Sequence, residues 1–393
     1  MSPAPRRNEV PVIYLDNGAT TWPKPESVYR AMDDFARHRA ANPGRGAHAM
    51  ALAAAAAVED ARLQVARLFH IGETQRLVFR ASTTDALNLA LFGLLGPRDH
   101  VVTSSMEHNS VSRPLRALQD WGVQVTRVQA DPFGWVDPEA VAAALTPATR
   151  LIVLNHVSNV TGTLQDAGAV GRLARERGAL FLVDAAQSAG VVPIDVERDA
   201  IDLLAFPGHK GLLGPMGTGG LYIGPRVDVD ELRPLCYGGT GGNSEEDVPP
   251  RALPIRYEAG TLNAIGLAGL AAGVRFVLEQ GVGRILAHER SLAERLAAGL
   301  AALPGVRVYV HPDPGRRTAV VSFTAEGWEP GDLGAILDQS FGIACRTGLH
   351  CAPDAARTIG AFPLGTVRFC PGWFTTEAEI EAAVDAVRRI LAT

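Results

Sequence analysis

The chain has 393 residues, of which 47% are hydrophobic and 20% are charged, as in an ordinary globular protein with a large core and about two domains. A net charge of −5 without a basic run excludes the usual signature of a nucleic-acid-binding protein, and the Ala-rich stretch 49–58 is too short to span a membrane. Four cysteines without CxxC spacing favour a reduced, cytoplasmic setting.

The first two thirds of the chain predict an α/β fold. An apolar segment at 12–15 and a helix at about 25–39 precede a helix-forming stretch at 47–69. Strands and helices then alternate, with strands expected at 77–80, 101–103, 123–128, 151–154, 180–183 and 203–206. This alternation predicts a mostly parallel sheet covered on both faces, and 220–223 is expected to return beside 203–206.

The remaining third predicts a smaller α+β domain. Helices are expected at about 264–279, 283–302, 330–340 and 375–392, and strands near 306–310, 318–323 and 366–369. We therefore expect a large domain at 13–264 and a small one at 265–393, on which the N-terminal residues 1–25 could pack. The Gly- and acid-rich segment 238–250 is expected to be a mobile loop near the site.

Polar side chains follow the predicted strands where each one ends. They are Thr83 and Thr84, His108, Asn159, Asp184 and Gln187, and His209 and Lys210. Ligands of open α/β sheets bind at the carboxyl edge of the strands. We therefore expect these residues to meet in one crevice.

Lys210 is the most informative of these residues. Only two of the 37 basic side chains are lysine, at 24 and 210, so 35 are arginine. Arginine stays protonated in proteins, whereas a desolvated lysine can lose its proton and attack an aldehyde such as that of pyridoxal phosphate. The alternative is a solvated loop lysine.

The other crevice residues each have a functional and a plain interpretation. Thr83 and Thr84 open a helix and could bind an anion there, or simply cap it. Asp184 could pair with a protonated pyridine nitrogen or cap the next helix. Gln187 could donate to a phenolate oxygen or be a surface amide, and His108 could stack on a ring, move protons or be solvated.

A second polar segment, 345–353, is predicted to be a loop. Cys351 lies beside His350 and five residues after Arg346, an environment that favours a reactive thiolate over a buried, inert thiol. Arg346 and Arg368 could hold a substrate carboxylate by their fork geometry, and surface ion pairing is the alternative for both.

Taken together, these motifs resemble the cysteine desulfurases of the class V aminotransferase fold. The resemblance covers about residues 12–390 and rests on eight segments: 15–20, 82–84, 106–109, 158–162, 183–187, 208–210, 258–261 and 346–351. The segment Arg346-Thr-Gly-Leu-His-Cys351 is most similar to the group II type, which has SUF-pathway and selenocysteine-lyase-like roles.

The resemblance implies fold type I of the pyridoxal-phosphate enzymes and a role for each matching residue. Lys210 would hold the cofactor covalently, with Asp184 at its pyridinium, Gln187 at its phenolate and His108 on its ring. The phosphate would be bound by Thr84, His209 and, from the partner subunit of a homodimer, Thr261. Asn159 and Arg368 would bind the substrate carboxylate, His48 and Arg346 would line the substrate mouth, and Cys351 would accept the sulfur as a persulfide.

Three positions depart from the family pattern. Pro207 stands where a Ser or Thr is usual, which removes one hydroxyl from the expected phosphate site. Leu349 replaces the first of two adjacent histidines, which could alter sulfur delivery. Gly18 replaces a usual Ala, which leaves more room near the substrate.

The expected activity is conversion of L-cysteine to L-alanine, with later sulfur transfer to an acceptor protein. Selenocysteine as substrate, another class V reaction, and a non-catalytic sulfur-carrier scaffold are the alternatives. A dispensable Cys351 would favour a lyase or another class V reaction, and absence of cofactor absorbance would favour the scaffold.

Overall fold

In the computed structural model, residues 12–44, 46–240, 245 and 247–392 are described. The largest element is a seven-stranded sheet with the order β2-β8-β7-β6-β5-β3-β4. Its strands are β2 (Leu77–Arg80), β3 (His100–Ser104), β4 (Gln124–Val128), β5 (Thr149–Asn155), β6 (Leu180–Asp184), β7 (Leu203–Pro207) and β8 (Gly219–Ile223). All neighbours pair in parallel except β8, which is antiparallel to β7 and β2, so the predicted mostly parallel sheet is confirmed.

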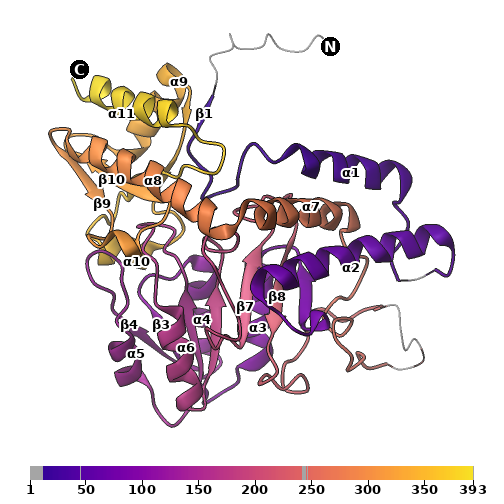
Figure 1. Ribbon diagram of the computed structural model, residues 1–393. Coiled ribbons are helices and arrows are strands. Elements are labelled where there is room, and N and C mark those ends of the chain that lie inside the picture. The colour runs from indigo at the N-terminus through magenta and orange to yellow at the C-terminus, as the bar shows by residue number, and fades with distance from the viewer. Residues whose placement is uncertain (1–11, 45, 241–244, 246, 393) are drawn as a thin grey trace.

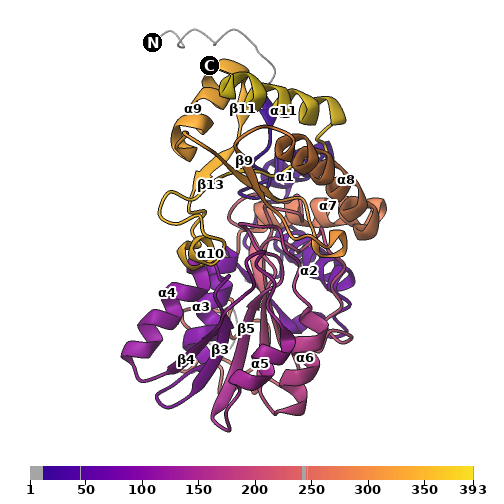
Figure 2. The same ribbon diagram turned by 90° about the vertical axis from the view of Figure 1, so that its left-hand side faces the viewer.

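Helices cover both faces of this sheet. Figure 2 shows α3 (Thr83–Leu94) and α4 (Asn109–Asp120) on one side, and α5 (Pro138–Ala144) and α6 (Ala167–Glu176) on the other. The second side also carries α2 (Ala49–Phe69) and α7 (Ala264–Gln280), which pack against each other. Helix α7 also packs against α1 (Glu26–His38) (Figure 1). The inner strands β6, β7 and β8 are almost entirely buried, because alternate residues of such strands enter the cores on opposite faces, as Val153 and Leu154 of β5 do. The edge strand β4 is mostly exposed.

A second sheet, with the order β12-β13-β10-β9, is built from the last quarter of the chain and is antiparallel throughout. Its strands are β9 (Val306–Tyr309), β10 (Val321–Ala325), β12 (Arg346–Gly348) and β13 (Thr366–Phe369). It shares a core with α8 (Val282–Ala301), α9 (Pro330–Phe341) and α11 (Glu377–Leu391). The N-terminal strand β1 (Ile13–Tyr14) pairs in parallel with β11 (Ile343–Ala344), next to this core.

Some elements differ from the sequence-based expectation. The segment 345–353 was expected to be a loop, but Arg346–Gly348 pairs with β13 and α10 (Pro353–Thr358) begins two residues after Cys351. The short helices α5 and α10 were not predicted, because six or seven residues carry too little periodicity. Of the expected loop at 238–250, residues 241–244 and 246 lie outside the described residues, as do residues 1–11 of the N-terminal segment.

Among the described residues, no single helix is long and apolar enough to cross a bilayer. Only α7 and α8 taken together, which are bent by 81° where they join, pass that test on length and composition.

Candidate active site

The carboxyl edge of the large sheet carries a pocket that gathers most of the predicted site residues. Eight of them line it: Thr83, Thr84, His108, Asn159, Asp184, Gln187, His209 and Lys210. They reach it from the ends of β5, β6 and β7, from the start of α3, and from the residue before α4. The expectation that these side chains meet in one crevice is therefore confirmed.

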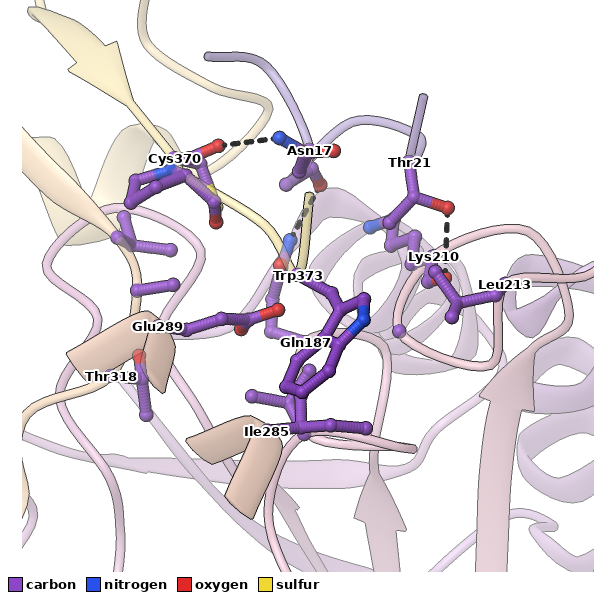
Figure 3. Close-up of a pocket in the computed structure, with 16 residues that line it drawn as sticks. Asn17, Thr21, Gln187, Lys210, Leu213, Ile285, Glu289, Thr318, Cys370 and Trp373 are labelled. Carbon is purple, nitrogen blue, oxygen red and sulfur yellow. Dashed lines mark hydrogen bonds between the residues drawn. The ribbon is translucent and has the colours of Figure 1, made fainter. Parts of the chain in front are cut away.

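Lys210 lies in the loop between β7 and β8 and lines both this pocket and a second cavity, which is drawn in Figure 3. Burial, followed by the charge of Arg368, lowers the pKa of Lys210 to about 8, and the charge of Asp184 opposes this shift. The Thr21 hydroxyl donates to the Lys210 carbonyl at 3.1 Å and holds this part of the loop. An amine with a pKa near 8 is neutral often enough at neutral pH to attack an aldehyde.

Asp184 ends β6 and is 3% exposed. Its Oδ1 accepts a hydrogen bond from the Ala186 backbone N–H at 2.9 Å. Burial raises the pKa of Asp184, and the charge of Lys210 partly offsets this effect. A carboxylate in this position would be stabilised by a cationic partner inside the pocket.

His108 is held in a defined tautomer by the start of α4. The Ser110 backbone N–H donates to His108 Nδ1 at 3.0 Å, so Nδ1 is an acceptor and the ring proton lies on Nε2. The Ser110 hydroxyl lies 2.8 Å from His108 Nδ1 and 2.8 Å from the Thr84 hydroxyl, and so links the two predicted residues. Burial, followed by the charge of Lys210, lowers the pKa of His108 to about 4, which leaves a neutral imidazole in the pocket.

Several polar atoms of the pocket wall have no partner among the described residues. The Oδ1 atoms of Asn155 and Asn159 and the Nδ1 atom of His209 are buried and make no hydrogen bond to any described residue. At the start of α3, the Ser82 hydroxyl accepts from the Asp85 N–H, which leaves the first amides of the helix for an anion. Unpaired buried polar atoms are costly, so they indicate a polar ligand, and the amides at the start of α3 fit an anionic group on it.

The residues present therefore fit pyridoxal phosphate. Lys210 offers an amine for its aldehyde, Asp184 a carboxylate for its ring nitrogen, and Thr83 and Thr84 a helix start for its phosphate.

Cys351 lies at the mouth of this pocket. It is exposed, it follows β12, and it adopts a left-handed backbone conformation with a φ of 60°. Arg346 Nη2 donates to Cys351 Sγ at 3.0 Å, and the Asn109 N–H donates to the Cys351 carbonyl at 2.8 Å. Cys351 lines an open groove together with Thr84 and His108, which also line the inner pocket. A thiol here can reach solvent and the pocket entrance.

Arg368 is fully buried rather than open to the pocket. Its Nη2 donates to Asp16 Oδ1 at 2.9 Å and its Nη1 to the Asn159 carbonyl at 3.0 Å, while Nε has no partner among the described residues. A Cβ on Gly18 would approach the Arg368 guanidinium to 3.2 Å and Cys370 Sγ to 3.3 Å. The missing side chain of Gly18 thus lets the guanidinium lie close to the N-terminal segment.

Two further predicted site residues, Thr261 and His48, lie away from the pocket in this chain. Thr261 is exposed and lines a different cavity, with Arg80 and Glu258 among its neighbours. His48 is exposed and caps α2, where its Nδ1 accepts from the Ala51 N–H at 3.3 Å. Gln187, in contrast, lines the pocket and donates to the Gly18 carbonyl at 2.9 Å.

Three residues near the site were not singled out by sequence reasoning. Ser110 joins His108 to Thr84, and only its place two residues after a histidine could have indicated this. Glu289 is 7% exposed and lines the cavity of Figure 3, where burial raises its pKa to about 8. Lys24 contacts the loop of Lys210, and its rarity as a lysine was an unused signal.

Comparison with known proteins gives one consistent result. The family described as "Aminotransferase class-V" matches residues 13–383. A "Probable cysteine desulfurase" of Methanothermobacter thermautotrophicus is 38% identical over 98% of this chain and 97% of its own length. The apo structure of a cysteine desulfurase from Thermococcus onnurineus has a TM-score of 0.89 at 35% identity, covering 97% of this chain and 95% of that one. The cysteine desulfurase CsdA of Escherichia coli has a TM-score of 0.86 at 30% identity, covering 97% and 95%.

Proposed function

Because this chain belongs to the aminotransferase class-V family, we propose that it is a pyridoxal-phosphate-dependent cysteine desulfurase, which converts L-cysteine to L-alanine and retains the sulfur as a persulfide on Cys351. One observation carries the proposal. An amine with a lowered pKa, Lys210, lies in a polar pocket, and an exposed thiol, Cys351, lies at the mouth of that pocket.

Each pocket residue would contact a different group of the cofactor. Lys210 would bind its aldehyde, Asp184 its ring nitrogen, Gln187 its phenolate oxygen, and the neutral His108 ring would stack on it. Thr83, Thr84 and His209 would receive its phosphate at the start of α3. When bound, the cofactor supplies an electron sink that eases loss of the α-proton of the amino acid.

The remaining steps belong to side chains of this chain. The Lys210 amine would take the α-proton of the substrate and later return a proton to the same carbon, because a pKa near 8 suits both roles at neutral pH. The Cys351 thiolate attacks the substrate sulfur. An S–S bond would form as the Cβ–S bond breaks, with the electron pair of the broken bond left on the carbon side. A proton added to Cβ, together with the proton returned to Cα, then gives alanine. Arg346, 3.0 Å from Cys351 Sγ, orients the thiol for this attack.

Arg368 offers two ways to bind the substrate carboxylate. Its guanidinium is paired with Asp16, so a substrate carboxylate must either replace Asp16 or use the remaining Nε donor. Asn159, whose Oδ1 is unpaired and whose carbonyl is bonded to Arg368, is the second predicted contact to the substrate.

The proposal includes a homodimer in which Thr261 of one subunit completes the phosphate site of the other. Exposure of Thr261, away from the pocket of its own subunit, supports this arrangement. Sedimentation of the purified protein as a monomer that still binds the cofactor would contradict it. Group II membership, His48 at the substrate mouth, an acceptor protein for the sulfur and a reducing, cytoplasmic setting are further parts of the proposal.

The proposal is tested by Cys351→Ala, with the exposed cysteine Cys236→Ala as the matched control. Cys351→Ala should abolish alanine and sulfide formation from L-cysteine, while the visible absorbance of the Lys210-bound cofactor persists. Cys236→Ala should keep both. Full turnover of cysteine in Cys351→Ala would refute the assigned nucleophile. Faster turnover of selenocysteine than of cysteine by both variants would favour the alternative lyase.

A further inference from the structure

Both lysines of this chain converge on one peptide unit. Lys210 follows His209 in the loop between β7 and β8, and Lys24 Nζ donates to the His209 carbonyl at 2.9 Å. The two lysines are 186 positions apart in the sequence, and the other 35 of the 37 lysine and arginine residues are arginine. The chain uses lysine only twice, and both lysines lie at this peptide. We infer that position 24, like position 210, needs a property of lysine that arginine lacks.

The contacts of Lys24 explain that requirement. Its Nζ donates to three oxygens: the His209 carbonyl at 2.9 Å, the Thr21 carbonyl at 2.9 Å and the Thr21 hydroxyl at 2.7 Å. An ammonium group has three N–H donors around one atom, whereas a guanidinium spreads its donors over a planar fork. Three acceptors that surround one point therefore fit lysine and not arginine.

Thr21 extends this contact to Lys210 itself. The Thr21 hydroxyl oxygen accepts a hydrogen bond from Lys24 Nζ, so the hydroxyl proton of Thr21 is free to be donated to a backbone carbonyl. The carbonyls of Lys210 at 3.1 Å and His209 at 3.2 Å are the available acceptors. The Lys210 contact is drawn in Figure 3. Thr20 adds a hydroxyl contact of 3.1 Å to the His209 carbonyl. The backbone on both sides of the Lys210 nitrogen is thus held by the N-terminal segment.

We propose that Lys24 is a positioning residue, whose ammonium holds the His209 carbonyl and the Thr21 hydroxyl and thereby fixes the direction in which the Lys210 side chain enters the pocket. The inference rests on the proposed function insofar as Lys210 captures the cofactor aldehyde. Burial lowers the pKa of Lys24 to about 8, which agrees with an amine enclosed by backbone rather than by carboxylates.

The first test compares how fast the apoproteins capture pyridoxal phosphate, followed by visible absorbance and by borohydride trapping with peptide mapping. Lys24→Met should slow capture at Lys210 by about 10- to 100-fold, the effect of a reacting group displaced by about an ångström. Lys24→Arg should be similarly slow, because the guanidinium cannot serve three converging acceptors. Arg30→Met, which removes an exposed cation of α1, is the matched control and should capture at the wild-type rate.

A second variant separates positioning from charge and from general loss of stability. Thr21→Val keeps the ammonium and removes the hydroxyl between Lys24 and Lys210. Because the two residues share one set of contacts, the slowing in the double variant should be smaller than the product of the single effects. Wild-type capture rates in Lys24→Met or in Lys24→Arg would overturn the proposal, and so would fully multiplicative effects.

The third measurement needs no cofactor. The Leu213 N–H is bonded to the Lys210 carbonyl and the Gly214 N–H to the Gly208 carbonyl, so both report on this loop. In the apoprotein, Lys24→Met should speed hydrogen exchange of these amides by about tenfold relative to Arg30→Met. If the wild type captures no aldehyde, the proposed function fails, and the exchange rates alone then decide the role of Lys24, with unchanged rates refuting it.

Discussion

Pro207→Ser offers a direct test of the phosphate site. Pro207 ends β7 and lines the pocket beside Thr83, Thr84 and His209. Serine at this position adds a hydroxyl donor that proline lacks. A hydrogen bond to a charged acceptor contributes about 1.5–3 kcal/mol, so pyridoxal phosphate should bind about 10- to 100-fold more tightly. Loss of the proline should lower the free energy of unfolding by no more than about 1 kcal/mol.

The assay is equilibrium binding of pyridoxal phosphate and of pyridoxal, which lacks the phosphate, to the two apoproteins. Only the phosphorylated ligand should gain affinity, because the added donor is expected to face the phosphate. Pro97→Ser, at an exposed turn before β3, is the control for a general effect of losing a proline. Equal gains for both ligands, or no gain for either, would show that position 207 does not contact the phosphate.

Two further predictions concern buried charges. Glu289 has a folded-state pKa of about 8 against an ordinary 4.5, so the folded protein holds more protons than the unfolded chain between these values and stability falls as pH rises through that window. In the wild type this effect should lower the free energy of unfolding by up to about 5 kcal/mol at pH 8. Glu289→Gln should remove it, which is measured by urea unfolding at pH 5 and pH 8. Arg62→Met should cost about 3–5 kcal/mol in the same assay, because it leaves the buried Glu258 carboxylate without its cationic partner.

Each of these has a matched comparison. Glu279→Gln, an exposed residue of α7, should leave the pH dependence as in the wild type, and an unchanged slope in Glu289→Gln would contradict the assigned burial effect. Replacing Arg62 and Glu258 together by apolar residues should recover much of the loss. A double variant as unstable as Arg62→Met would argue against the unpaired charge as its cause.

Much of the fold was predictable because its signals are local. Apolar runs such as 151–154 and 180–183 indicate strands buried on both faces, and the polar residues directly after them mark the carboxyl edge. The family and the fold class are confirmed by the comparisons. The division at 264 and the individual roles of the site residues stay predictions.

Other features were not predictable because they depend on contacts between distant parts of the chain. The loop expected at 345–353 is partly a strand, since Arg346–Gly348 finds its partner only in β13. The expected contact of Arg368 with the substrate stays a prediction, but the pairing of Arg368 with Asp16, 352 positions away, could not be predicted from local sequence.

By itself, the sequence determined the strand-helix alternation, the place of the polar residues at the ends of the strands, and the singular chemistry of Lys210 and Cys351. These properties follow from side-chain types within a few residues of one another. The tertiary structure alone decided that Ser110 is hydrogen-bonded to both Thr84 and His108, and that the Lys24 ammonium donates to the carbonyl of His209, the residue before Lys210. Hydrogen bonds act over about 3 Å, and only the folded chain brings such distant residues within that range.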